Sequence, residues 1–185
     1  MSIKSNWIAL LYKSATGTKK VRTLLTPVGL IVFGLFLALT IFISIKADQL
    51  FAIGWFIPNF PTYFSGLAIL FLGVWLVTWS VIHFFKEKGT PVPLNPPPKL
   101  VTGGPYQYVR NPMISGIFFL LFGLGFLIKS PALVFVFTPL FIVLNLFELK
   151  TIEEPELQLR LGKEYEIYKK GTPMFLPKIL KRWKR

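Results

Sequence analysis

The sequence predicts an all-α, polytopic membrane protein with about four transmembrane helices. Of its 185 residues, 53% are hydrophobic and only 16% are charged, and 19 are phenylalanine. A soluble domain of this size and composition would leave large apolar patches exposed. The high apolar content also excludes an intrinsically disordered chain, which would be rich in polar residues. The charged residues are also concentrated between long uncharged runs, which is typical of membrane-spanning helices.

The first span is predicted at residues 23–45, which contain no charged residue. At about 1.5 Å per residue, this helix is long enough to cross a hydrocarbon core of about 30 Å. The next uncharged run is too long for one helix. Pro58 and Pro61 interrupt it, so the second span is predicted at residues 62–85, and residues 51–57 are expected at the membrane interface.

Two further uncharged runs, residues 111–128 and 130–147, predict a helical hairpin over residues 112–150. Lys129 separates them, and Ser130-Pro131 has the pattern of an N-cap followed by proline at the first helical position. Each run has 18 residues, which is the lower limit for a spanning helix. We therefore expect the hairpin to be tilted, kinked or partly sheltered by the other spans.

The positions of the basic residues predict the topology. The chain has 21 Lys and Arg against 8 Asp and Glu, and only Lys46 and Lys129 lie in the connections opposite the termini. Basic loops stay in the cytoplasm, so both termini are predicted there. Basic residues placed at the ends of spans favour anionic lipid headgroups as partners and argue against nucleic acid.

Three segments follow from these features: a basic amphipathic segment at 1–22, two transmembrane helices with an interfacial connection at 23–85, and a functional region at 86–185. In the first segment, Ile3, Trp7, Leu10 and Leu11 share one helical face, which suits a membrane anchor. The third segment is expected to hold a loop, the hairpin, a cytoplasmic helix and a basic tail.

The loop before the hairpin is rich in proline and cannot be a helix. It ends in Gly103-Gly104-Pro105-Tyr106, where two glycines, which have no Cβ, precede a proline, whose ring fixes its φ. Such a segment either lets backbone approach a ligand closely or forms a rigid interfacial turn. The spacing alone leaves both interpretations open.

Acidic and basic residues lie at the two ends of the predicted hairpin. Arg110 and Asn111 precede its first helix, whereas Glu148, Glu153 and Glu154 lie at or just after the end of its second. An antiparallel hairpin brings both groups to one membrane face, so we expect them to be neighbours. A carboxylate near the membrane needs a cationic partner, which makes Arg110, Glu153 and Glu154 the candidate catalytic residues. The residues Leu157, Leu161, Tyr165 and Tyr168 share one face of a helix and are expected to pack.

The second half of the chain carries an ordered series of short motifs. They are Gly89-Thr90-Pro91, Pro96-Pro97, Leu100-Val101, Gly104-Pro105-Tyr106, Val109-Arg110-Asn111-Pro112-Met113, Gly116, Glu153-Glu154-Pro155-Glu156-Leu157, Gly162-Lys163-Glu164-Tyr165 and Tyr168. This series, within residues 86–177, resembles the integral membrane methyltransferases related to isoprenylcysteine carboxyl methyltransferase and phospholipid methyltransferase. Each motif is weak alone, and the order of the set makes the resemblance specific.

The resemblance implies a cytosol-facing pocket for S-adenosylmethionine and a membrane-facing tunnel for a lipophilic substrate. Tyr106 and the Gly104 backbone would flank the adenosine, Asn111 would contact the methionine part, and Glu153 or Glu154 would pair with its ammonium group. Arg110 would hold the cofactor carboxylate or an anionic acceptor. The implied cofactor-binding residues are Gly104, Pro105, Tyr106, Asn111, Pro112, Met113, Gly116, Glu154, Tyr165 and Tyr168.

One position departs from the family pattern. The best-known members have Arg-His-Pro where this chain has Arg110-Asn111-Pro112. Asparagine still donates and accepts hydrogen bonds, but it cannot act as an acid or base. The single histidine, His83, does not replace the missing one by position and is interpreted as an interfacial aromatic residue.

The predicted function is therefore S-adenosylmethionine-dependent methyl transfer to a lipophilic acceptor, either an isoprenylcysteine-like carboxylate or a lipid amine. This chemistry needs alignment of donor and acceptor and no metal, which agrees with a chain that has no Cys and one His. Two alternatives are a membrane reductase that uses NADPH and a non-enzymatic lipid-binding protein. A reductase is disfavoured because no Gly-rich fingerprint follows a predicted strand.

Overall fold

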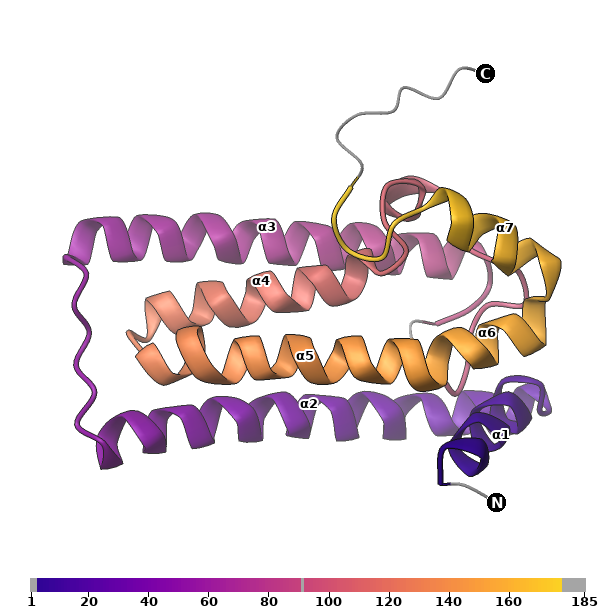
Figure 1. Ribbon diagram of the computed structural model, residues 1–185, viewed down its shortest axis with the longest axis horizontal. Helices are drawn as coiled ribbons and strands as arrows, with labels where there is room; N and C mark the ends of the chain where they lie inside the picture. The colour runs from indigo at the N-terminus through magenta and orange to yellow at the C-terminus, as the bar shows by residue number, and fades with distance from the viewer. Residues whose placement is uncertain (1–2, 91, 178–185) are drawn as a thin grey trace.

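The computed structural model describes residues 3–90 and 92–177, and within these ranges it contains helices and loops but no strand (Figure 1). The α-helices are α1 (Ile3–Ala15), α2 (Lys19–Leu50), α3 (Asn59–Lys86), α4 (Pro112–Leu127), α5 (Thr138–Glu148), α6 (Glu154–Leu161) and α7 (Lys163–Gly171). A 3₁₀ turn η1 (Gly104–Gln107) and two π-helical segments, η2 (Leu133–Phe137) and η3 (Leu149–Glu153), complete the helical elements. The predicted all-α class is confirmed.

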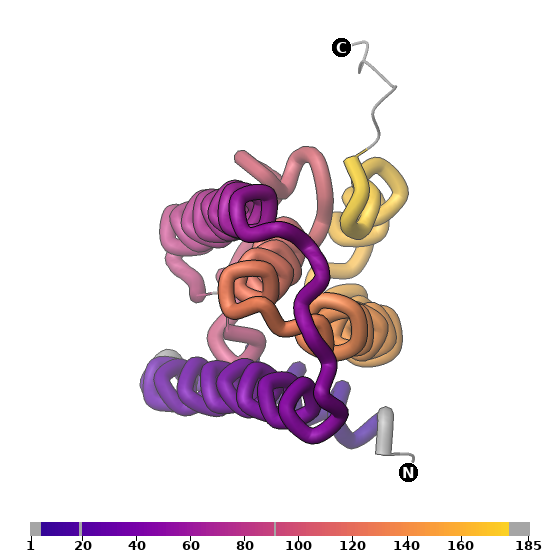
Figure 2. The backbone as a smooth tube through the Cα atoms, turned by 90° about the vertical axis from the view of Figure 1, so that its left-hand side faces the viewer, coloured from indigo at the N-terminus to yellow at the C-terminus, as the bar shows by residue number. Residues whose placement is uncertain are grey.

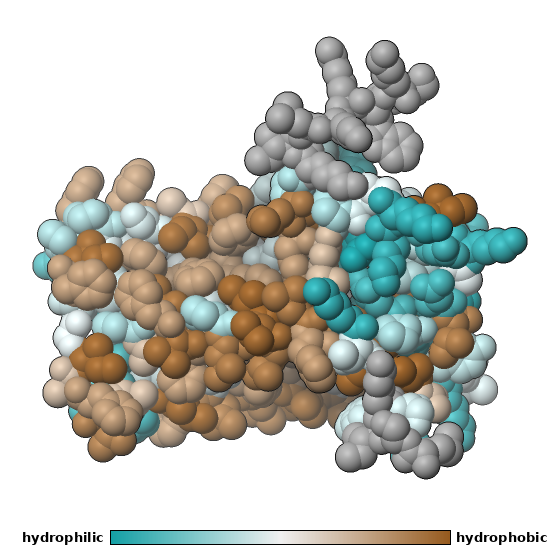
Figure 3. Space-filling view, viewed as in Figure 1, coloured by the Kyte–Doolittle hydropathy of each residue, from teal (hydrophilic) through white to brown (hydrophobic). Residues whose placement is uncertain are grey.

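Three helices are long and apolar enough to cross a membrane: Lys20–Leu50, Asn59–Lys86 and Leu133–Leu161. The fourth apolar helix, α4, has 16 residues, or about 24 Å of helix, which is shorter than a hydrocarbon core of about 30 Å. Hydrophobic residues cover most of the visible face of the helical bundle, and hydrophilic ones gather at the end formed by α6 and α7 (Figure 3). The protein is therefore a membrane protein whose described residues contain three candidate spanning helices and one shorter apolar helix.

The first two spans are longer than the sequence predicted. α2 begins at Lys19 and continues to Leu50, with Pro27 inside it. α3 begins at Asn59, so that Pro61 lies in the first turn instead of ending the preceding segment. Backbone N–H groups in the first turn of a helix have no acceptor within the helix. Proline lacks this N–H, so it does not break the helix there.

Glycines allow α3 and α4 to pack with their backbones in contact. A Cβ on Gly73 would lie 2.8 Å from the Leu120 nitrogen and 2.9 Å from the Gly116 oxygen. A Cβ on Gly123 would lie 2.6 Å from the Leu70 nitrogen. Small residues on facing helices are how membrane helices approach closely without a hydrophobic driving force. Gly116, which the resemblance assigned to the cofactor site, therefore serves helix packing.

The second arm of the hairpin begins with a cap supplied partly by α2. Ser130 Oγ accepts a hydrogen bond from the Leu133 N–H at 3.1 Å, as an N-cap does. Asp48, near the end of α2, accepts hydrogen bonds from the Ser130 hydroxyl and from the Ala132 N–H. The predicted Ser130-Pro131 helix start is confirmed, and Asp48 joins it to α2.

This second arm does not end near residue 150 as predicted. η2, α5, η3 and α6 follow one another without a loop, so the apolar helix continues to Leu161. It ends at Gly162, whose φ of 57° is in the left-handed region that favours glycine. The expectation of one helical face running from Leu157 to Tyr168 was wrong, because Gly162 separates α6 from α7.

The buried core lies where the two hairpin arms meet α2 (Figure 2). It consists of Ile117, Phe118, Leu121, Leu133 and Phe141, against which Phe33, Leu37 and Ile41 of α2 pack. Phe118 of α4 lies inside this core and does not face lipid. It is only 8% exposed and its ring lies edge-on to Phe141, with centroids 5.9 Å apart, so it belongs to the core.

The proline-rich loop between α3 and η1 is held at both sides. Asn95 Nδ2 donates a hydrogen bond to Thr26 Oγ1 of α2 at 2.9 Å. Arg160 of α6 donates to the Pro97 carbonyl at 3.2 Å and pairs with Glu156 at 2.8 Å. α1, this loop, α6 and α7 lie at the same end of the bundle (Figure 1), and α1 contacts α6 and η3. These polar contacts of the loop, α6 and α7 therefore lie at one end of the bundle.

Candidate functional site

The centre of the candidate site is an ion-pair cluster around Glu154. Its side chain is 8% exposed, and Oε1 lies 2.6 Å from Arg110 Nη2 while Oε2 lies 2.6 Å from Lys169 Nζ. Arg110 Nη1 also donates to the Lys169 carbonyl at 2.9 Å. The expected neighbourhood of Arg110 and the acidic residues thus includes Glu154, because the hairpin returns α6 to the start of α4.

One nitrogen of Arg110 remains without a partner. Its Nε is buried and has no hydrogen-bond acceptor within residues 3–90 and 92–177. The backbone here is fixed as well, because the main-chain N–H of Arg110 donates to the Pro173 carbonyl at 2.8 Å and that of Asn111 to the Met174 carbonyl at 3.1 Å. The guanidinium itself is held through Nη1 and Nη2. A fixed guanidinium with an unused donor is suited to binding an anionic group.

Glu153 differs from its neighbour Glu154. It is half-buried, and no ion pair to it is found in the described part of the chain. It ends the π-helical segment η3, and the carboxylate of Glu148, also half-buried, is close enough to interact with it electrostatically. π-Helical turns inside α-helices occur frequently at functional sites. Glu153 therefore offers a carboxyl group that forms no ion pair in the described part of the chain.

The η1 turn connects this cluster to α3. Tyr168 of α7 donates its hydroxyl to the Tyr106 carbonyl at 2.7 Å, and the Tyr106 ring packs edge-on against Phe84, with centroids 5.3 Å apart. Tyr106 is 5% exposed, and its hydroxyl lies close to the Ser80 side chain of α3. Burial raises the pKa values of Tyr106, Tyr165 and Tyr168 above the usual range, so the three phenols stay neutral.

The remaining predicted cofactor residues lie in η1 and at the start of α4. Pro105 and Pro112 are buried, and Asn111 and Met113 are half-buried. Asn111 precedes α4, but its side chain caps no backbone N–H there. Its amide is thus not committed to holding the helix start.

Sequence reasoning missed the position of His83. The histidine lies against η1, since a Cβ on Gly104 would be 2.3 Å from both its Cε1 and Nε2 atoms. Gly104 has a φ of 59°, so both backbone conformation and space favour glycine there. The signal was present as the four-residue spacing of Trp75, Trp79 and His83 before a Gly-Gly pair.

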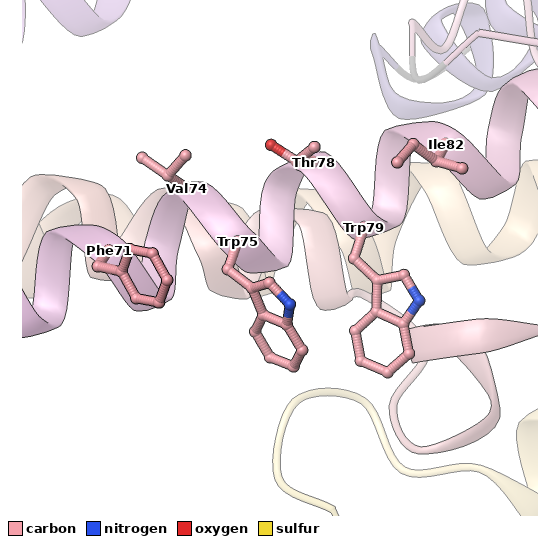
Figure 4. Close-up of a pocket in the computed structure, with 6 residues that line it drawn as sticks. All are labelled: Phe71, Val74, Trp75, Thr78, Trp79 and Ile82. Carbon is pink, nitrogen blue, oxygen red and sulfur yellow. The ribbon is translucent and has the colours of Figure 1, made fainter.

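Two hollows flank these residues. One, of about 390 Å³, lies between α1, α6 and α7 and is lined by Ile8, Lys150, Glu154, Pro155, Gln158, Leu159 and Lys169. The other is an open apolar groove of about 350 Å³ on α3, lined by Phe71, Val74, Trp75, Thr78, Trp79 and Ile82 (Figure 4). Within residues 3–90 and 92–177, no group of three His, Cys, Asp or Glu side chains could hold a metal ion.

Comparison with known proteins agrees with this arrangement. The sequence profile of the phospholipid methyltransferase family matches residues 61–164, from α3 through η1 and the hairpin to the start of α7. A methanethiol S-methyltransferase of Crocosphaera subtropica is 32% identical over 134 residues, which are 72% of this chain and 47% of the relative. The chain thus spans about half the length of the curated relative that it matches. No solved structure matches significantly.

The matched region contains most of the helix pair α3–α4, the η1 turn, Arg110 and the Glu153-Glu154 pair. Two residues of the candidate site, Tyr168 and Lys169, lie just beyond it. More than half of the chain lies within the match. The protein therefore belongs to the phospholipid methyltransferase family.

Proposed function

We propose that this protein is a membrane methyltransferase that uses S-adenosylmethionine to methylate a lipophilic acceptor. The observation that carries the proposal is the cluster of Arg110, Glu154 and Lys169, in which Arg110 and Glu154 are largely buried, at one end of an apolar bundle. A polar site at the end of lipid-exposed helices suits a water-soluble cofactor and an acceptor that arrives from the bilayer. Membership in a methyltransferase family supports the reaction class.

The unpaired groups of the site fit the charged ends of the cofactor. Its amino-acid part carries a carboxylate and an ammonium group. The buried Arg110 Nε is a free donor for the carboxylate, and Asn111 lies next to it with an amide available for hydrogen bonding. Of the two glutamates considered for the ammonium group, we assign Glu153, because Glu154 already pairs with two cations.

The residues of this site need to align the methyl donor with the acceptor and to exclude water. They do not need to supply a nucleophile. The cofactor, when bound, brings a sulfonium methyl group that is already electrophilic. Tyr106, Pro105 and Pro112 give the site buried apolar walls, and the link from Tyr168 to Tyr106 holds η1 against α7. Holding two reactants in a near-attack geometry contributes several kcal/mol, on the order of 7 to 11 at best.

The acceptor is expected to be lipophilic. An isoprenylcysteine-like carboxylate and a lipid amine both agree with the resemblance, and the name of the curated relative adds a thiol sulfur as a third class of acceptor. A carboxylate would be favoured by Arg110, since attack on a sulfonium neutralises both charges in a poorly hydrated site.

Calorimetry on the full chain in lipid nanodiscs tests the cofactor. S-adenosylmethionine and its demethylated product should both bind, whereas NADPH should not. Glu153→Gln should weaken the binding of S-adenosylmethionine. Glu166→Gln is its matched control, because Glu166 is an exposed carboxylate on α7 whose partner, Lys170, is also exposed. Binding of NADPH without S-adenosylmethionine would instead favour the reductase, and binding of neither would favour a non-enzymatic lipid-binding protein.

Methyl transfer is tested by incubating the nanodiscs with a radiolabelled methyl donor and a membrane lipid extract. Label should partition into the organic phase. Label found only in water-soluble molecules would contradict a lipophilic acceptor.

A further inference from the structure

An aromatic row on α3 leads from the middle of the membrane helix to the candidate site. Trp75, Trp79 and His83 follow one another at intervals of four residues, with ring centroids 4.9 Å and 6.3 Å apart. Figure 4 shows that Trp75 and Trp79 point to the same side of α3. Trp79 also lies 6.5 Å from the ring of Tyr108, which follows η1. The row therefore ends where α3 meets the loop of the site.

The hydrogen bond of His83 determines which of its nitrogens carries a proton. Nδ1 lies 2.8 Å from the Trp79 carbonyl oxygen. A carbonyl can only accept, so Nδ1 donates, and in the neutral ring Nε2 keeps its lone pair. No hydrogen-bond partner of Nε2 is found in the described ranges. His83 thus presents an unused base whose tautomer is fixed by its own helix.

This base is in contact with the loop assigned to the cofactor. The Cε1 and Nε2 side of the ring lies against Gly104, where a Cβ would come within 2.3 Å of both atoms. Gly103 is nearby too, since its Cβ would lie 3.7 Å from His83 Cδ2. Asn111 stands where the resemblance expects histidine and cannot accept a proton. The other ionisable groups of the site are the cations Arg110 and Lys169, the carboxylates already described and neutral phenols.

The groove on α3 approaches His83 from the membrane. It ends at Trp79 and Ile82, immediately before the histidine, and its apolar lining is open to the lipid-facing side. Phe71 and Trp75 line it further from His83 along α3 and are 74% and 49% exposed. An aliphatic chain in this groove would place its head group next to His83 and η1.

We propose that His83 accepts the proton of a lipophilic thiol during methyl transfer, and that the α3 groove holds the aliphatic part of that thiol. This inference rests on the proposed function. The thiol sulfur attacks the methyl carbon, the bond from that carbon to the sulfonium sulfur breaks with its electron pair going to the cofactor sulfur, and the S–H proton moves to His83 Nε2. The products are a thioether, the demethylated cofactor and a protonated imidazole.

A thiol suits this base better than the other acceptor classes. A carboxylate has no proton to lose at neutral pH. An alkylammonium has no lone pair and must lose its proton before its nitrogen can attack. A neutral thiol sulfur already has a lone pair, so a base can take its proton while the new bond forms.

The kinetic test compares two thiols of similar hydrophobicity with the wild-type protein and His83→Gln in nanodiscs at pH 8. Decanethiol is mostly protonated at this pH, whereas 4-butylthiophenol is mostly thiolate. His83→Gln should lower kcat with decanethiol by about 100-fold, the lower range of general base catalysis, and with the thiophenol by less than about 5-fold. Equal losses with both thiols would overturn the assignment of His83 as the proton acceptor.

A spectroscopic test does not depend on turnover. His83 is the single histidine, so ¹⁵N-histidine labelling gives imidazole signals from this residue alone. The wild-type protein should show protonated Nδ1 and unprotonated Nε2, and decanethiol without cofactor should shift the Nε2 signal. A protonated Nε2 in the neutral ring would overturn the inference.

The same experiments separate this inference from the proposed function. If S-adenosylmethionine binds and decylamine or a carboxylate is methylated while neither thiol is, the thiol assignment is wrong and the proposed function stands. If wild-type protein binds no S-adenosylmethionine, the proposed function itself is wrong, and the role of His83 with it.

Discussion

Glu154 Oε1 and Arg110 Nη2 lie 2.6 Å apart although 44 residues separate them in the chain, and both side chains are about nine-tenths buried. Lys169 pairs with the other oxygen of Glu154, so one carboxylate joins α4, α6 and α7. Removing one member of such a buried pair leaves an uncompensated charge, which is far costlier than losing an exposed ion pair.

Glu154→Gln is therefore expected to destabilise the fold as well as the site. The loss should be about 3 to 5 kcal/mol, because Arg110 would remain buried without its carboxylate. Thermal unfolding in nanodiscs measures it. Glu166→Gln should change stability by less than about 1 kcal/mol, since both partners of that pair are exposed. Equal unfolding temperatures for the two variants would show that the buried cluster does not stabilise the junction.

Asn111→Ala should weaken cofactor binding and leave the stability of the fold unchanged. The Asn111 side chain caps no backbone N–H, and the backbone contact to Met174 persists in the variant. Loss of one hydrogen bond to a bound polar ligand costs about 1 to 3 kcal/mol of binding free energy. Calorimetry should show weaker S-adenosylmethionine binding with an unchanged unfolding temperature. Unchanged affinity would remove Asn111 from the site.

Gly73→Ala should separate α3 from α4. The added Cβ would meet backbone atoms of Leu120 and Gly116 at under 3.0 Å, and helix backbones cannot move aside as a flexible side chain can. We expect a destabilisation of about 1 to 3 kcal/mol, as for other overpacked sites. Gly34→Ala in α2 is the matched control, because its Cβ would meet nothing within 4 Å. A loss of stability as large in Gly34→Ala as in Gly73→Ala would disprove the packing argument.

Asp48→Ala should loosen the start of the second hairpin arm. It removes the acceptor of the Ser130 hydroxyl and of the Ala132 N–H, two donors at the helix start. Loss of a helix cap costs about 0.5 to 2 kcal/mol. Amide hydrogen exchange should show faster exchange at residues 132–134 in this variant. Gln49→Ala, which removes only an exposed contact with Lys46, should not change these rates.

The predicted topology can be tested with single cysteines, because the chain contains none. Cysteines at Lys46 and Lys129 should react with an impermeant reagent applied from outside, and a cysteine at Lys99 only after permeabilisation. The basis is the concentration of basic residues on one side of the spans. Labelling of Lys99→Cys in intact cells would place the site loop on the wrong side of the membrane. Lys178 and the rest of the predicted basic tail, Lys181, Arg182, Lys184 and Arg185, lie outside the described residues.

The sequence by itself determined the helical class, the approximate spans and the family. Uncharged runs long enough to cross a bilayer need no tertiary information, because every backbone hydrogen bond of a membrane helix is made within the helix. The Ser130-Pro131 helix start is equally local. The proximity of Arg110 to Glu154 was also predictable, since an antiparallel hairpin brings its two ends together whatever its detailed packing.

The tertiary structure decided which partner each site residue has. Glu153 and Glu154 are adjacent in sequence, but only Glu154 faces Arg110 and Lys169, because η3 and the helix rotation set their directions. Gly116 faces α3 rather than the site, and Phe118 faces the core rather than lipid. Periodicity gives the faces of a helix, but which face meets protein and which meets lipid depends on neighbouring helices when both faces are apolar.

The position of His83 was beyond the sequence for the same reason. A histidine near the end of a membrane helix is ordinarily an interfacial residue, and its contact with Gly104 depends on how the loop after α3 folds back. That fold is fixed by contacts between residues distant in the chain, such as Asn95 with Thr26 and Arg160 with Pro97. Long-range contacts of single polar side chains leave no periodic trace in a sequence, so only the assembled helices and loop bring His83 to the candidate site.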